Sequence, residues 1–372
     1  MARWNHIGFL PTQRMWIVMK KLFRIIIILF GMLLAAAVLL FAALVITEYK
    51  PSEVEAIVPE GTLSGQNVRA GEDLTFLTWN IGYAALGKDS DFVMDGGGKV
   101  PAANRETVGK YLDGIKSTVA SNSDADILMF QEVDSSSSRS FRINESKELA
   151  KGIRSYALNY SCIFVPFPWP PFGTVNSGLL TTSDYDMSSA ERISLPCPFS
   201  WPVSAANLKR CLLVSRFPVE GSEKELVVVN LHLEAYAGSE GKRAQAEKLK
   251  DFIVSEFEKG NYVIAGGDFN QLFPGSVESY PNVHTDLWDV SLLDEADLEK
   301  GFSYICDLET PSCRLLNQPY DPSDTANTQY YVIDGFIVSP NIQVNSVETL
   351  DAGFEYSDHN PVKLSAVLLP EN

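Results

Sequence analysis

Runs of apolar residues mark the predicted elements of this chain. The longest run, residues 25–47, contains 23 residues without a charge, enough to cross the roughly 30 Å hydrocarbon core of a bilayer as a helix. A cleaved signal peptide has an apolar region of only roughly 7 to 15 residues, followed by a small-residue cleavage site. We therefore interpret residues 25–47 as an uncleaved transmembrane helix.

The charges before this run predict its orientation. Residues 1–24 carry five basic residues and no acidic residue. Because positive segments stay in the cytoplasm, the N-terminus should be cytoplasmic and the rest of the chain should lie outside. The sequence thus predicts a single-pass protein of the plasma membrane with an extracytoplasmic domain.

The remaining chain predicts an α/β domain. Residues 48–73 lose periodicity and gather prolines and glycines, which is typical of a tether or an irregular lead-in. From residue 74 onwards, short apolar runs alternate with amphipathic stretches. Predicted strands cover 74–80, 126–134, 177–182, 210–215, 225–233, 262–270, 330–338 and 362–369, and predicted helices cover 105–120, 144–157, 242–259 and 286–297. The predicted segments are therefore a basic segment (1–24), a membrane helix (25–47), a linker (48–73) and one large domain (74–372).

Polar side chains follow the ends of several predicted strands. Asp268 and Asn270 come just after an apolar run that stops at two glycines, and side chains two apart in an extended chain point the same way. Asn80, Glu132 and His232 end three other strands, and a late loop adds Asp358 and His359. Each residue alone could be a cap, a turn residue or a buried histidine. Their joint occurrence favours a common catalytic site.

Net charge bears on the partners. Beyond residue 50 the chain has 24 basic and 46 acidic residues, a net charge of −22, compared with −17 for the whole chain. Such a surface repels phosphate backbones, which argues against a high-affinity nucleic-acid binder without excluding a nuclease. All five cysteines lie after residue 50, and Cys306 and Cys313 are close enough in sequence for a disulfide, which would still leave an odd thiol.

Two proline-rich stretches carry large aromatic rings. Four prolines between residues 161 and 172 exclude a central strand or helix, and this stretch contains Trp169. Trp201 lies in a second proline-flanked stretch. Because loops lie at the surface and Trp is favoured at membrane interfaces, these rings could contact lipid. Alternatively, they cover a satellite core beneath a long loop.

The order of the polar motifs resembles that of the endonuclease/exonuclease/phosphatase superfamily. The motifs are Trp79-Asn80, Gln131-Glu132, Asn230-Leu-His232, Gly267-Asp-Phe-Asn270, Asp334 and Ser357-Asp-His359. Members of this superfamily include pancreatic deoxyribonuclease, abasic-site endonucleases, neutral sphingomyelinases and inositol polyphosphate phosphatases. The resemblance spans about residues 74–369 and implies a four-layered α/β sandwich, in which two mixed sheets pack face to face with helices outside.

The residue types and the resemblance agree on a metal-dependent chemistry. A phosphate ester resists attack because its oxygens are negative, so a divalent cation must neutralise charge. Glu132 and Asn80 offer oxygen ligands suited to Mg²⁺, which Mn²⁺ or Ca²⁺ could replace, and Asp358 would help at the metal.

The resemblance also implies roles for the other residues. His359 would be the general base, with Asp334 accepting its other ring proton. Asp268 and Asn270 would orient the nucleophile and the phosphoryl oxygen, and His232 would contact phosphate oxygens. From residue type alone, Asn176, Arg210 and Arg314 are further candidates to bind phosphate, and Trp169 and Trp201 to bind substrate at the interface.

We therefore predict a membrane-anchored, outward-facing, Mg²⁺-dependent phosphoesterase that hydrolyses a phosphodiester, with a phospholipid as the favoured substrate. One alternative is an extracellular deoxyribonuclease-like endonuclease, for which nucleic acid is a substrate. A second is a non-catalytic ectodomain that binds lipid or a partner. Retention of both histidines in the motif set argues against this last alternative.

Overall fold

A computed structural model describes residues 13–99, 104–235, 239–284, 287–288, 290–295, 298–299 and 301–370. The chain divides into two units, Met1–Glu48 and Tyr49–Asn372. The described part of the first unit contains one helix, α1 (Gln13–Ile46). Its segment Met15–Ile46 is long and apolar enough to cross a membrane.

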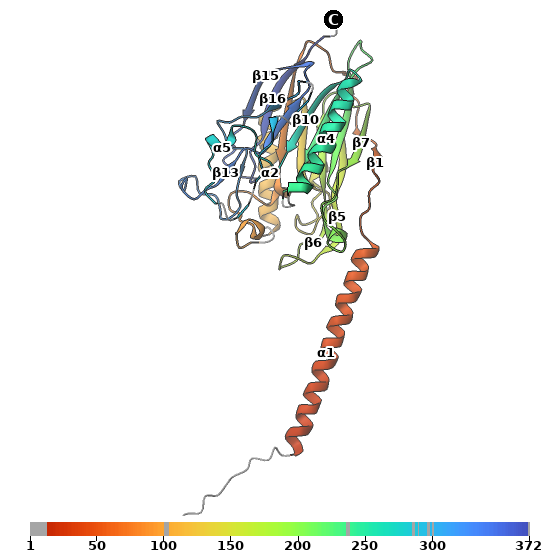
Figure 1. Cartoon of the computed structure of the whole chain (residues 1–372), viewed down its shortest axis with the longest axis vertical. Coiled ribbons are helices and arrows are strands. Elements are labelled where there is room, and N and C mark those ends of the chain that lie inside the picture. The colour runs from red at the N-terminus through yellow and green to blue at the C-terminus, as the bar shows by residue number, and fades with distance from the viewer. Residues whose placement is uncertain are drawn as a thin grey trace, which may run out of the picture. The chain divides into compact units, whose positions relative to one another are not determined.

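The second unit is built on two seven-stranded sheets in the described residues (Figure 1). The first sheet contains, in order, β1 (Val54–Ile57), β7 (Ser189–Ser194), β8 (Cys211–Pro218), β9 (Glu225–His232), β10 (Tyr262–Asp268), β14 (Asp334–Val338) and β11 (Ser303–Ile305). The second contains β15 (Ile342–Thr349), β16 (Val362–Leu368), β3 (Asp73–Asn80), β4 (Ile127–Asp134), β6 (Gly173–Ser183), β5 (Ile153–Val165) and β2 (Glu60–Gly61). Both sheets are mixed, because β9–β10 and β3–β4 are parallel pairs among antiparallel ones.

The helices and a small hairpin complete the unit. The α-helices are α2 (Arg105–Ser121), α3 (Glu145–Glu148), α4 (Ser239–Glu258) and α5 (Ser276–Ser279), and the 3₁₀ turns are η1 (Gly82–Ala84), η2 (Val93–Asp95) and η3 (Val203–Ala206). Two short strands, β12 (Cys313–Arg314) and β13 (Tyr330–Tyr331), pair separately.

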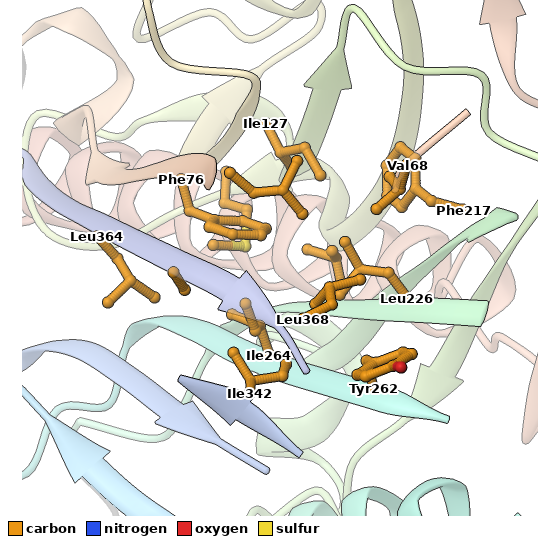
Figure 2. Packing of buried hydrophobic residues seen from close by; sticks show 14 of the residues in the cluster. Val68, Phe76, Ile127, Phe217, Leu226, Tyr262, Ile264, Ile342, Leu364 and Leu368 are labelled. Carbon is orange, nitrogen blue, oxygen red and sulfur yellow. The ribbon is translucent and has the colours of Figure 1, made fainter. Parts of the chain in front are cut away.

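Three clusters of buried side chains define four layers. Between the sheets, Phe76 and Ile127 of the second sheet pack with Leu226 and Ile264 of the first (Figure 2). On the outer face of the second sheet, residues of α2 pack with β3 and β4. On the outer face of the first sheet, residues of α4 pack with β9 and β10. Because successive strand residues point to opposite faces, strands covered on both sides are apolar throughout. The predicted four-layered sandwich is confirmed.

Residues 49–73, all but the first residue of the predicted linker 48–73, belong to the second unit. Strand β1 pairs with β7, strand β2 pairs with β5, and Val68 is fully buried in the core between the sheets. Prolines and glycines interrupt the hydrophobic periodicity of residues 48–73, but the four residues of β1 are enough to form an edge strand. Only two residues therefore separate the end of α1 at Ile46 from the start of the second unit at Tyr49.

Other local predictions were wrong. Within predicted helix 144–157 only α3 is helical, and from Ile153 the chain forms β5, which pairs with β6. Helix α3 ends at Glu148, and Gly152, just before β5, adopts φ 62°, where an added Cβ would lie 2.1 Å from the Ser183 carbonyl oxygen. Predicted helix 286–297 falls partly outside the described residues, and none of its described residues is α-helical. All five cysteines are free, so Cys306 and Cys313 form no disulfide.

Candidate active site

Strand register brings the predicted polar residues to one edge of the two sheets. Strands β9 and β10 run parallel with His232 opposite Asp268, and antiparallel β14 places Asp334 on the other side of Asp268. In the second sheet, β3 ends at Asn80, and the parallel strand β4 carries Glu132 two residues before its end at Asp134. The two sheets thus bring together residues that are far apart in the sequence. Asn80 Nδ2 donates a hydrogen bond to Asp268 Oδ2 at 3.0 Å, although the two residues are 188 positions apart.

Unusual backbone geometry directs these side chains. Gly267 adopts φ 147°, and a Cβ there would lie 2.0 Å from the Leu231 carbonyl oxygen, so only glycine fits. Asn270 and Glu132 have φ of 51° and 54°, a region that side-chain-bearing residues seldom adopt. Glu132 lies where the pairing of β4 with β6 shifts register. Such strained positions cluster at functional sites.

His359 forms a buried pair with Asp334. The Nδ1 atom of His359 lies 2.8 Å from Asp334 Oδ2, which also accepts a hydrogen bond from Ser312 Oγ at 2.8 Å. Burial opposes a charge on the ring, but the neighbouring Asp334 carboxylate outweighs it and raises the pKa of His359 well above its usual value. The other ring nitrogen, Nε2, lies 3.9 Å from Asp268 and 4.0 Å from Asp358. The pair thus fixes the ring with Nε2 toward the other acidic groups.

Asp268 lies between the two histidines. Its Oδ1 accepts from the Asn270 backbone N–H at 2.9 Å, and its Oδ2 lies 3.5 Å from His232 Nε2. Burial, with the nearby charge of Asp334, raises the pKa of Asp268 to about 6. Burial, with the positive charge of Arg210, lowers the pKa of His232 well below its usual value. His232 is therefore neutral at pH 7, and its Nδ1 has no hydrogen-bond partner in the described part of the chain.

Glu132, Asp358 and Asn80 supply oxygen atoms suited to a cation. Burial raises the pKa of both carboxyl groups, and the charge of Glu132 contributes to raising that of Asp358 to about 7. Two buried acidic groups that disfavour each other's charge are chemically suited to a divalent metal ion, which would neutralise both. Asp268, Asp334 and His359 also lie close enough to share an ion. Because Asp334 Oδ2 already accepts hydrogen bonds from His359 and Ser312, we interpret Asp334 and His359 as a hydrogen-bonded pair and not as metal ligands.

One cavity of about 580 Å³ joins these residues. The predicted residues in its lining are Asn80, Glu132, Arg210, His232, Asp268, Asn270, Arg314, Asp358 and His359. Asp334 lies behind His359 and does not line it. Another cavity, of about 290 Å³, lies beside α4 and contains none of the predicted site residues.

The two predicted arginines are buried and already paired. Arg210 donates to Glu234 Oε2 at 3.2 Å and to the His232 carbonyl at 3.0 Å. Arg314 donates to the carbonyl oxygens of Gly87 and Ser90 at 3.0 and 3.2 Å, among others. Both therefore support the cavity wall, and phosphate binding by either stays a prediction.

Asn176 and the two tryptophans lie outside the cavity lining. Asn176 accepts from Ser161 Oγ at 2.8 Å, while its neighbour Ser177 lines the cavity, because adjacent strand residues point to opposite faces. Trp169 and Trp201 are 82% and 62% exposed. This exposure contradicts the alternative that these two rings cover a satellite core.

Arg139 and Tyr83 are cavity residues that sequence reasoning missed. Arg139 donates to both carboxylate oxygens of Asp134, at 3.1 and 2.9 Å, and its guanidinium carbon lies 3.6 Å from the Tyr83 ring centre. The available signal was an arginine in a serine-rich loop, seven residues after Glu132. Tyr83, in η1, gave no comparable signal.

Most of the chain matches one known protein family. The sequence model of the Endonuclease/Exonuclease/phosphatase family matches residues 77–359. No curated protein matches the chain. An endonuclease/exonuclease/phosphatase crystal structure from Beutenbergia cavernae is 16% identical, with 80% of this chain and 72% of that one covered and a TM-score of 0.52. At this identity the likeness shows the fold alone.

Two further solved structures are similar at lower TM-scores. One is an endonuclease/exonuclease/phosphatase from Bacteroides vulgatus, 16% identical over 80% of this chain and 99% of that one, with a TM-score of 0.49. The other is the human nocturnin catalytic domain with bound sulfate, 15% identical over 83% of this chain and 96% of that one, with a TM-score of 0.47.

Proposed function

Because the chain belongs to the endonuclease/exonuclease/phosphatase family, we propose that it is a membrane-anchored, metal-dependent phosphodiesterase acting on a phospholipid. The observation that carries the hydrolytic activity is the convergence of a neutral histidine, a histidine–aspartate pair and two buried carboxyl groups on one cavity. A protein that only binds its ligand does not need these histidine and carboxyl groups in one cavity. Hydrolysis of an ester by water can use each of these groups, because the reaction needs a proton acceptor and groups that neutralise the phosphate oxygens.

The chain's own residues divide the proton transfers. His359, oriented by Asp334, presents Nε2 toward the cavity and takes a proton from water. Asp268, which Asn80 holds in place, orients that water. His232 is neutral and donates through a ring N–H to a phosphate oxygen. Asn270, beside Asp268, contacts a phosphoryl oxygen through its side chain.

Glu132, Asp358 and Asn80 would hold Mg²⁺, with Mn²⁺ or Ca²⁺ as substitutes. When bound, the cation neutralises the negative phosphate oxygens and stabilises the charge that develops during attack. Positive charge beside Asp358 also lowers the pKa of His359, which favours the neutral ring that a general base needs.

Three observations support a lipid substrate at the outer face of the plasma membrane. The basic segment before α1 favours a cytoplasmic N-terminus and an extracytoplasmic second unit. Trp169 and Trp201 expose their rings in loops, and Trp is favoured at the interface between lipid and water. The acidic balance after residue 50 suits a single head group better than a polyanion.

The test compares the turnover of lipid vesicles and of plasmid DNA by the full-length protein. We expect faster lipid turnover, reduced about tenfold in Trp169→Ala/Trp201→Ala and unchanged in Leu63→Ala, which removes a side chain that is also exposed. Faster DNA cleavage would favour the nuclease alternative. Binding of lipid without turnover of any phosphodiester would favour the non-catalytic ectodomain.

A further inference from the structure

The cavity has a second, apolar end. Its apolar lining residues include Val165, Phe167, Phe172, Phe199 and Val203, whose side chains can neither carry charge nor form hydrogen bonds. We call this set the apolar arm. The catalytic residues lie in the same continuous cavity, so a single ligand can contact both ends. At about 580 Å³ the cavity is within the roughly 300–1,000 Å³ typical of small-ligand sites.

Two loops form the apolar arm, and sheet register places both beside the catalytic residues. Residues 166–172 join β5 to β6, and residues 195–210 join β7 to β8. In the second sheet, the end of β4 at Asp134 pairs with Ser177 near the start of β6. In the first sheet, Leu231, next to His232, pairs with Leu212 near the start of β8. Both loops therefore leave the sheets at the edge where the catalytic residues lie.

Stacked side chains mark the boundary between the two ends. The Phe172 and Phe92 rings stack at 6.2 Å and 20°. The guanidinium carbon of Arg139 lies 6.0 Å from the Phe172 ring and 3.6 Å from the Tyr83 ring. Arg139 thus stands between the acidic groups and the apolar arm, where a positive charge would meet a phosphate that arrives with an apolar substituent.

The outer part of the apolar arm is exposed although it is held in place. Phe167 and Val203 are 76% and 57% exposed. The loop that carries Val203 is tied to β5, because Tyr160 Oη donates to the Ala206 carbonyl at 3.0 Å and the Lys209 N–H donates to the Asn159 carbonyl at 2.7 Å. Apolar side chains held in water beside a cavity are characteristic of a binding surface for an apolar ligand.

We propose that the apolar arm binds one hydrocarbon chain of an amphiphilic phosphoester while its phosphate lies among His232, Asp268 and His359. This inference rests on the proposed function, since it takes the polar end as the phosphate site. The chain would leave the bilayer at Phe167 and Val203 and pass Phe199 toward Phe172. A nucleotide would instead place hydroxyl groups against side chains that cannot bond them, which disfavours its binding.

The first measurement needs no variant. Full-length protein in a lipid-free amphipathic polymer is titrated with alkylphosphonates of two to ten carbons, below their micelle concentrations, with Mg²⁺ present. Each buried methylene contributes about 0.8 kcal/mol, or about fourfold in affinity, so even partial burial predicts at least tenfold tighter binding from two to eight carbons. Affinity independent of chain length would overturn the proposal.

The second measurement compares variants in the same polymer. Phe167→Ala and Phe199→Ala should each reduce the ratio of eight-carbon to two-carbon affinity at least about threefold, while Leu63→Ala, at a similarly exposed site, should leave the ratio unchanged. Equal ratios in all three variants would contradict the apolar arm. Hydrolysis of a short phosphodiester is assayed in parallel. Its absence, with chain-length-dependent binding retained, would reject the proposed phosphodiesterase and support the apolar arm.

Discussion

Replacing Asp334 with asparagine tests the histidine–aspartate pair without changing its size. The change removes a negative charge that lies 2.8 Å from His359 Nδ1 and that Ser312 Oγ also contacts at 2.8 Å. If the amide nitrogen of asparagine took the place of Oδ2, it would place an N–H donor opposite the Nδ1–H donor of His359. The ring would then turn or take the wrong tautomer. The catalytic base would then be misplaced although every cavity-lining side chain is retained.

The expected loss follows from the proton transfer that the pair supports. A positioned general base contributes roughly 10² to 10⁴ in rate, and Asp334 acts through His359, so kcat should fall at least about 100-fold. Because Asp334 does not line the cavity, KM should change less than about threefold.

The assay is steady-state hydrolysis of a soluble phosphodiester by the full-length protein with Mg²⁺. Asp307→Asn serves as a matched control, because Asp307 accepts hydrogen bonds only from the backbone of Glu309 and Thr349 among the contacts described. Thermal unfolding of both variants checks that the fold survives. A folded Asp334→Asn protein with kcat within tenfold of wild type would refute the assignment of His359 as the base.

Three further predictions address the site, the topology and the stability. Asp268→Ala should remove at least about 99% of phosphodiesterase activity with the fold retained. Near-normal turnover would contradict the proposal that Asp268 orients the attacking water. Protease added outside intact cells should cleave sites after residue 49, whereas full protection would reverse the proposed orientation. Burial opposes the charge of Glu256, but its hydrogen bonds to Arg216 lower the pKa of this carboxyl group to about 2. The carboxylate therefore stabilises the fold at any pH above its unfolded pKa, and this contribution is lost as the pH falls toward 2. Glu256→Gln should therefore lower the free energy of unfolding by up to about 3 kcal/mol at pH 7, with the difference shrinking between pH 5 and pH 2 in urea denaturation, and a pH-independent difference would contradict this account.

The sequence predicted the sandwich because its central strands are short apolar runs that end in polar groups. The runs at β9 and β10 are buried on both faces, so their pattern is continuous and easily recognised. Edge strands were harder to predict. Strand β1 is four residues long and gains its stability from pairing with β7, a partner about 135 residues away that local pattern cannot reveal.

The candidate site was predictable where a residue ends a strand and was missed where tertiary contacts place it. Asn80, His232 and Asp268 follow apolar runs and meet as expected. Arg139 reaches the cavity because Asp134 and the Tyr83 ring hold it, and Ser177 replaces Asn176 in the lining through strand alternation. A one-residue error in register reverses the face to which a side chain points.

Metal-dependent turnover by the intact protein is the most direct test of the proposed phosphodiesterase activity. Full-length protein is stripped with a chelator and assayed on a soluble phosphodiester before and after Mg²⁺ is restored, alongside His359→Ala. We expect hydrolysis by wild type to stop with chelation and to return with Mg²⁺, and we expect His359→Ala to be at least about 100-fold slower than wild type with Mg²⁺ present. Hydrolysis that survives complete chelation, or that His359→Ala retains in full, would contradict this proposal.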